Sequence, residues 1–136
     1  ATKEDDQQPG MVEVNKDKYG LLESTGISSH SKENVIQSLK QWDVWNDNIK
    51  LIEGWFQDTV PLNDIDRIAV LRLDGDLYES TKVCLEHLYP KVEKGGLIII
   101  DDYQLGGCHK AVHEYIEENN LNIEMKRLSY TAYWYK

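Results

Sequence analysis

The sequence predicts an α/β fold with parallel strands and a closing antiparallel hairpin. Two nearly continuous apolar runs, Ile68–Leu73 and residues 97–100, have the pattern of strands that are buried on both faces of a parallel sheet. The stretch between them carries a helical apolar stripe, so the three segments together predict a right-handed β-α-β crossover. Two alternating segments further along the chain, residues 123–128 and Thr131–Tyr135, predict the hairpin.

A polar segment precedes the first predicted helix. Residues 1–30 contain glycine and show no sustained apolar period, so we expect a loop or lid there rather than core. Ser31 can cap a helix whose apolar stripe includes Val35 and Leu39, and this helix is expected to pack on the sheet. Residues 48–53 alternate as a short strand, which the Gly-Trp-Phe sequence after it would end.

Capping and turn signals predict the remaining elements. Asp76 begins a segment with the spacing of a capping box, which indicates that Asp76 caps the crossover helix and that Pro90 ends it. The pair Gly95 and Gly96 is expected to turn the chain into the second buried strand. A last helical stripe over residues 107–119 predicts a helix before the hairpin.

Composition narrows the classes of function. The 136 residues suffice for one domain with its own core, and a net charge of −9 disfavours binding to nucleic acid or to an anionic membrane surface. The two cysteines lack the spacing of a zinc site and are interpreted as reduced thiols. No apolar stretch could span a bilayer and no signal-peptide pattern is present, so a cytoplasmic protein is expected.

Acidic residues follow both buried strands. Asp74 and Asp76 come after the first strand, and Asp101 and Asp102 come after the second. Because the carboxyl ends of parallel strands meet at one edge of a sheet, these carboxylates are expected to lie close together. Oxygen ligands of this kind suit Mg²⁺ or Ca²⁺, or the cluster could hold a catalytic base. The alternative is structural: Asp at a strand end often caps the next turn or helix, the role expected for Asp76.

Other residues carry weaker signals. His109 and His113 are one helical turn apart, a spacing that can bind a metal, although an exposed helix face is the simpler interpretation. Trp55 and Phe56 could stack on a flat ring or could belong to the core. Arg72 lies within a buried strand and needs an acidic partner, for which a strand-end carboxylate is the natural candidate. Neither a dinucleotide-binding glycine loop nor a P-loop is present.

Four segments of the chain resemble the macrocin O-methyltransferase (TylF/MycF-type) family. They occur in order: IEGWFQDT at residues 52–59, LRLDGDLYEST at 71–81, LYPKV at 88–92 and GGLIIIDDY at 95–103. The resemblance covers residues 31–136 and implies the C-terminal portion of a Rossmann-like methyltransferase sheet. The first thirty residues resemble that family's substrate lid only loosely.

The resemblance also implies an activity and a metal site. Members of the family are S-adenosylmethionine- and Mg²⁺-dependent enzymes that methylate a sugar hydroxyl in macrolide tailoring. Carried onto this sequence, the family pattern makes Asp74, Asp101 and Asp102 the metal ligands, and it lets Asp74 act as the general base or beside it. Mg²⁺ held there would lower the pKa of a hydroxyl on a small-molecule acceptor.

Cofactor and substrate contacts follow from the same resemblance. Gly54, Trp55 and Phe56 fall where such folds hold the adenine of S-adenosylmethionine. Tyr78 and Tyr103 fall near the substrate side. These five residues complete the site that the resemblance implies.

One part of the family pattern has no counterpart in this sequence. The strand and glycine loop that grip the methionine and ribose of the cofactor precede, in the family, the point where this chain starts. We therefore expect a partial methyltransferase domain at residues 31–136, either a fragment or a natural remnant, whose exposed sheet edge favours homodimerisation. The alternative function is a catalytically inactive metal-binding or interaction module that retains the fold.

Overall fold

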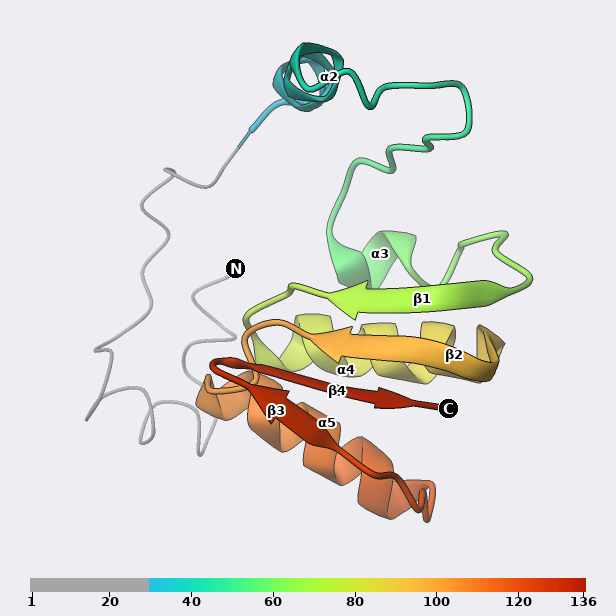
Figure 1. Ribbon diagram of the computed structural model, residues 1–136, viewed down its shortest axis with the longest axis vertical. Coiled ribbons are helices and arrows are strands. Elements are labelled where there is room, and N and C mark those ends of the chain that lie inside the picture. The colour runs from blue at the N-terminus through green and yellow to red at the C-terminus, as the bar shows by residue number, and fades with distance from the viewer. Residues whose placement is uncertain (1–29) are drawn as a thin grey trace.

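A four-stranded sheet forms the centre of the structure, a computed structural model that describes residues 30–136. The strands are β1 (Ile68–Leu73), β2 (Val92–Ile100), β3 (Lys126–Leu128) and β4 (Thr131–Tyr135). They lie in the order β1-β2-β4-β3, and helices α4 (Tyr78–Leu88) and α5 (Gly106–Glu118) lie along one face of the sheet (Figure 1). The predicted mixed α/β architecture is confirmed.

The predicted β-α-β crossover is present. Strands β1 and β2 are parallel, and α4 with the short 3₁₀ turn η2 (Tyr89–Lys91) connects them. Leu73 pairs with Ile100, so the two strands end side by side, and the amide of Asp101 donates a hydrogen bond of 2.9 Å to the carbonyl of Leu73. Both acidic strand ends therefore lie at one edge of the sheet.

The glycine pair lies inside β2 rather than in a turn before it, so the predicted turn is wrong. The register between β1 and β2 shifts where the pair lies opposite the start of β1. A Cβ on Gly96 would come within 2.6 Å of the Val92 side chain and 3.0 Å of the Ala69 carbonyl oxygen. The glycine thus lets the two strands approach at an irregular register, which is a common role for glycine within a strand.

The core lies between the sheet and the two helices. Its most deeply buried large side chains come from all of these elements: Leu77, Leu85, Ile98, Ile100, Val112 and Trp134. Cys84 of α4 and Cys108 of α5 are also buried, and both are free thiols, as expected. Burial raises the pKa of Cys84 to about 11 and that of Cys108 to about 12.

The predicted hairpin closes the sheet. Strands β3 and β4 are antiparallel, with Ser129 in the left-handed region (φ 55°) at the turn, and β4 is also antiparallel to β2. The first strand of the hairpin is shorter than predicted. Only residues 126–128 pair with a neighbour, and they pair with the first three residues of β4.

The part of the chain before β1 differs more from the predictions. Helix α2 (Lys32–Gln41) begins as expected at Ser31, whose side chain accepts a hydrogen bond from the amide of Asn34. Contrary to expectation, α2 buries no residue and lies away from the sheet (Figure 1). The strand predicted at residues 48–53 does not form either. A strand needs a neighbour for its backbone groups, and this segment runs apart from the described sheet (Figure 1).

The polar segment at residues 1–30 lies outside the described residues except for His30. Helix α3 (Phe56–Thr59) is a single turn beside β1 (Figure 1). None of the helices in the described part of the chain is long and apolar enough to cross a membrane.

Candidate functional site

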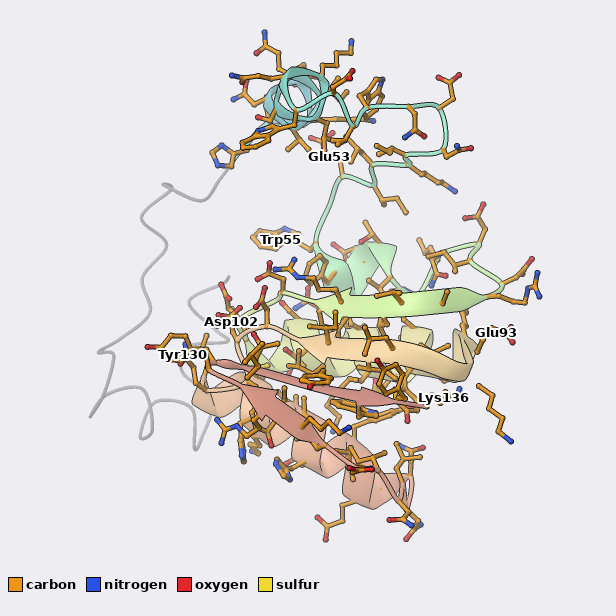
Figure 2. All side chains as sticks on the ribbon, in the orientation of Figure 1. Glu53, Trp55, Glu93, Asp102, Tyr130 and Lys136 are labelled. Atoms are coloured by element: carbon orange, nitrogen blue, oxygen red, sulfur yellow. The ribbon has the colours of Figure 1, made fainter. Side chains whose placement is uncertain are left out.

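Three carboxylates converge where β1 and β2 end. Asp74 and Asp76 follow β1 and Asp102 follows β2, and one oxygen of each lies within 4.8 Å of the others. Figure 2 labels Asp102 at the end of the sheet where the loops after these strands meet. The prediction that the strand-end acids gather at one edge is confirmed for these three residues.

Asp76 belongs to this group instead of capping α4, so the predicted capping role is wrong. The N-cap of α4 is Leu77, and no side chain caps that helix. Asp76 has a left-handed backbone (φ 58°), a conformation that Asp adopts more readily than most residues. The sequence signal for the cluster is the Asp-Gly-Asp spacing at the end of β1. Glycine suits the position between the two acids because a Cβ there would lie 3.1 Å from Cβ of Ser80 and 3.3 Å from Cε2 of Phe56.

Mutual repulsion and burial perturb the acidic cluster. The pKa of Asp102 is raised to about 7, first by burial and then by hydrogen bonding and charge from Asp76 and Asp74. Carboxylates this close are stable together only when a proton or a cation neutralises part of their charge. Their donor set is all oxygen, which fits a hard divalent cation such as Mg²⁺.

Asp101 lies next to this group but has different partners. Its Oδ2 atom accepts a hydrogen bond from Nη2 of Arg72, and its Oδ1 atom accepts one of 3.1 Å from the hydroxyl of Thr131. The same Nη2 atom lies 2.9 Å from Oδ2 of Asp74. The expectation that Arg72 pairs with a strand-end carboxylate is confirmed, whereas metal binding by Asp101 stays a prediction.

A cavity of about 640 Å³ opens beside the carboxylates. Its lining combines acids, small residues and two aromatic rings: Gly54, Trp55, Phe56, Asp74, Gly75, Asp76, Ser80 and Asp102. The Trp55 side chain is 56% exposed, and in Figure 2 it lies at the same end of the sheet as Asp102. The structure thus places the three predicted adenine contacts in one cavity with the acids. Ser80 also lines it, although no sequence signal singled this residue out.

The backbone at Gly54 sets the position of the aromatic pair. Gly54 has φ +138°, and a Cβ there would lie 2.7 Å from Cγ2 of Thr59. The Thr59 hydroxyl donates a hydrogen bond of 2.8 Å to the carbonyl of Trp55 across the single turn of α3. A glycine is therefore required for the chain to enter α3 with Trp55 and Phe56 at the cavity.

The two tyrosines expected on the substrate side do not line this cavity. The Tyr78 hydroxyl donates a hydrogen bond of 2.6 Å to Oε2 of Glu114. Tyr103 is 3% exposed, and its hydroxyl lies 2.5 Å from Nε2 of His113. A substrate role for either tyrosine stays a prediction, since both hydroxyls already have partners within the fold.

The histidine pair on α5 forms an aromatic stack. The rings of His109 and His113 stack with centroids 4.2 Å apart, and burial lowers the pKa of His109. Within residues 30–136, metal-binding side chains gather in a group of three only at Asp74, Asp76 and Asp102. The histidines thus fit a helix surface better than a metal site.

Comparison with known proteins supports the assignment that the site suggests. A model of the macrocin O-methyltransferase (TylF) family matches residues 7–136. The 8-demethyl-8-(2,3-dimethoxy-alpha-L-rhamnosyl)-tetracenomycin-C 4'-O-methyltransferase of Streptomyces olivaceus is 40% identical over 116 residues, 81% of this chain and 44% of that protein. The mycinamicin III 3''-O-methyltransferase of Micromonospora griseorubida is 35% identical over 131 residues, 96% of this chain and 50% of that protein.

Solved structures show the same relationship. The O-methyltransferase NovP superposes with a TM-score of 0.75 at 41% identity, over 78% of this chain and 45% of that one. A TDP-rhamnose 3'-O-methyltransferase of calicheamicin biosynthesis gives a TM-score of 0.52 at 28% identity, over 62% of this chain and 40% of that one. The chain spans about half the length of the curated relatives it matches. From sequence, motifs and fold together, the chain belongs to the macrocin O-methyltransferase family.

Proposed function

We propose that this chain carries the acceptor-activating side of an S-adenosylmethionine- and Mg²⁺-dependent O-methyltransferase site. The acceptor is a hydroxyl of a sugar or of a similar vicinal diol on a small molecule. The observation that carries the proposal is the convergence of three carboxylates in one cavity with two aromatic rings. Family membership supports methyl transfer to oxygen, because the relatives compared above are named as O-methyltransferases. Two of them are named for rhamnose-containing molecules, which supports a sugar hydroxyl as the acceptor.

The acidic cluster provides the proposed metal site. Asp74 and Asp102 would hold Mg²⁺, with Asp101 as the third protein ligand once its own partners release it. When bound, the ion would act as a Lewis acid that lowers the pKa of a coordinated hydroxyl. The raised pKa of Asp102 is consistent with this proposal: burial raises it first and the neighbouring Asp76 and Asp74 raise it further, and a cation would offset the contribution of these two carboxylates.

The aromatic side of the cavity provides the proposed cofactor contact. Gly54, Trp55 and Phe56 would hold the adenine of S-adenosylmethionine, whose sulfonium supplies an electrophilic methyl group. Trp55 offers an exposed flat ring for stacking, and Phe56 is 40% exposed beside it. A donor held on this side and an acceptor held by the acids would meet within one cavity, which is the orientation that favours direct transfer.

A carboxylate in the same cavity would accept the proton of the hydroxyl. We propose Asp74 for this role, with Asp76 beside it as the second candidate. Asp76 is the second candidate because its carboxylate lies within 4.8 Å of those of Asp74 and Asp102 and lines the same cavity. Comparing Asp74→Asn with Asp76→Asn separates ligand from base. Loss of methyl transfer with Mg²⁺ binding retained marks the base, and loss of both marks a ligand.

Calorimetry on the purified chain tests the proposal. Saturable heats are expected for both MgCl₂ and S-adenosylmethionine, and Asp102→Asn should weaken the first while leaving the second. Mg²⁺ binding without cofactor binding would favour the inactive metal-binding module instead. If neither ligand binds, the acids have a structural role in this chain and the proposed function is wrong.

A further inference from the structure

Arg72 contacts the carboxylates that follow both parallel strands. Its Nη2 atom lies 2.9 Å from Oδ2 of Asp74 and also donates to Oδ2 of Asp101. One nitrogen thus bridges the residue that follows β1 and the residue that follows β2. A positively charged group at this position occupies the place of a counter-ion shared by two carboxylates.

This arrangement explains why Asp101 stands apart from its neighbour Asp102. Both carboxylate oxygens of Asp101 are engaged, Oδ2 by Arg72 and Oδ1 by the hydroxyl of Thr131. With these partners Asp101 lies outside the group of carboxylate oxygens that converge within 4.8 Å, so it has to shift relative to Arg72 or Thr131 to join a cation held by Asp74 and Asp102. Of the two, the contact with Arg72 is the one that is shared with the cluster.

We propose that Arg72 is a positioning residue that exchanges with the divalent cation. In the cation-free chain its guanidinium holds Asp74 and Asp101 together, and when the cation enters, Asp101 leaves Arg72 and joins the cation. The inference rests on the Mg²⁺ site of the proposed function, and it adds an internal competitor to that site.

The exposure of the partners makes such an exchange feasible. The side chains of Arg72 and Asp74 are 54% and 48% exposed, and that of Asp101 is 32% exposed. Ion pairs in contact with water are weak because the solvent screens them. A divalent cation carries twice the charge of a guanidinium in a smaller volume, so it can displace one from shared carboxylates.

A double-mutant cycle read by MgCl₂ calorimetry tests the exchange. Arg72→Gln should tighten Mg²⁺ binding about three- to tenfold, because the cation no longer competes with the guanidinium. Asp101→Asn should weaken binding, and Arg72→Gln added to it should recover less than about twofold. Arg67→Gln is the matched control: Arg67 lies before β1 and pairs with Glu93 at the opposite end of the sheet (Figure 2), so its loss should have little effect.

Each outcome distinguishes the exchange from simpler explanations. An equal gain from Arg72→Gln in both backgrounds would show a general charge effect and would overturn the exchange while leaving the Mg²⁺ site intact. Unchanged or weaker binding in Arg72→Gln would also overturn it. If the wild-type chain binds no Mg²⁺ at all, both the metal site and the exchange are wrong.

A measurement on the unaltered protein covers the case in which a variant does not fold. In the wild-type chain, saturating Mg²⁺ should shift the side-chain Nε–H resonance of Arg72 in a nitrogen-proton NMR spectrum, whereas that of Arg67 should stay in place. An Arg72 resonance that does not move at saturation would overturn the exchange. Arg72→Lys, which keeps the charge but not the planar fork, should bind Mg²⁺ with an affinity between those of wild type and Arg72→Gln.

Discussion

Asp102 couples the acidic cluster to pH. Its pKa is raised from 3.8 to about 7 by burial and by two neighbouring carboxylates. Between these values the folded chain keeps a proton on Asp102 that the unfolded chain has released. The folded state thus binds more protons in this window, so its stability falls as pH rises from about 4 to about 7.

The first prediction follows from this proton. Without Mg²⁺, urea unfolding should show greater stability at pH 5 than at pH 8, and Asp102→Asn should reduce that difference because the amide does not titrate. With MgCl₂ present, binding must displace the proton, so Mg²⁺ affinity should rise as pH increases through about 7. A wild-type pH dependence that Asp102→Asn leaves unchanged would contradict this role of Asp102.

A second residue-level prediction concerns Gly54. Gly54→Ala should destabilise the fold by about 1–2 kcal/mol, because a Cβ would lie 2.7 Å from Cγ2 of Thr59 in a backbone conformation that favours glycine. It should also weaken binding of S-adenosylmethionine by moving Trp55. The matched control is the double variant Gly54→Ala with Thr59→Ser. Serine lacks Cγ2 but keeps the hydroxyl, so this variant should recover part of the lost stability and part of the lost cofactor binding. Thermal melting and calorimetry measure the two effects.

At the scale of elements, polar contacts join α4 to α5 near the site. The Tyr78 hydroxyl on α4 donates to Glu114 on α5, and Lys82 lies 3.5 Å from Glu114 and 3.4 Å from Glu118. Hydrogen bonding to Tyr78 lowers the pKa of Glu114, which keeps that carboxylate charged. The two helices that support the loops of the site are therefore held together beyond their apolar contact.

The third prediction tests whether Tyr78 serves the helices or the substrate. Tyr78→Phe should lower the free energy of unfolding by about 1 kcal/mol, because it removes a partly buried hydrogen bond to a carboxylate. Binding of Mg²⁺ and S-adenosylmethionine should not change. Tyr135→Phe, at a tyrosine that is 62% exposed, should be neutral in chemical denaturation. If Tyr78→Phe instead leaves stability intact and raises the KM for an acceptor, the substrate role implied by the sequence is supported.

The sequence predicted best those elements whose partners are close along the chain. Strands β1 and β2 each have a nearly continuous apolar run, and α4 between them has a helical apolar stripe. The parallel crossover that these three elements form places the ends of both strands at one edge of the sheet. Residues 48–53 have a strand pattern, but a pattern cannot supply the neighbouring strand that is needed to form one. The turn predicted at the two glycines of β2 is wrong for a related reason, since glycine occurs both in turns and at irregularities within strands.

Within the site, the sequence identified positions better than roles. Asp74 and Asp102 were found from strand ends alone, and the partner of Arg72 followed from the cost of an unpaired charge. The capping role predicted for Asp76 is wrong because a capping box and an acidic cluster share the same local spacing. Local spacing also could not show that Asp101 faces Arg72 and Thr131, because those contacts depend on how three strands lie together.

At the scale of the whole molecule, the described sheet has helices on one face only (Figure 1). Strand β1 lies at the edge, and its Val70 side chain is 57% exposed. An edge strand presents unpaired backbone groups, and apolar side chains beside it favour pairing with another chain. Homodimerisation through this edge stays a prediction.

The fourth prediction addresses that edge. Sedimentation of the purified chain should show concentration-dependent dimers, and Val70→Lys should weaken their association by on the order of tenfold because a charged edge resists pairing. Leu62→Lys is the control, since Leu62 is 84% exposed but lies outside the sheet. A wild-type chain that stays monomeric at high concentration, or an equal effect of both substitutions, would rule out association through β1.

The two buried thiols can report local opening of the helices that carry them. Cys84 lies on one of the packed helices and Cys108 on the other, and a thiol with a pKa of about 11 or 12 exposes almost no reactive thiolate while the helices stay in place. An alkylating reagent can therefore reach either sulfur only when its helix opens. The rate of labelling at each cysteine would show separately how often α4 and α5 leave the sheet, and how far a bound ligand slows each event.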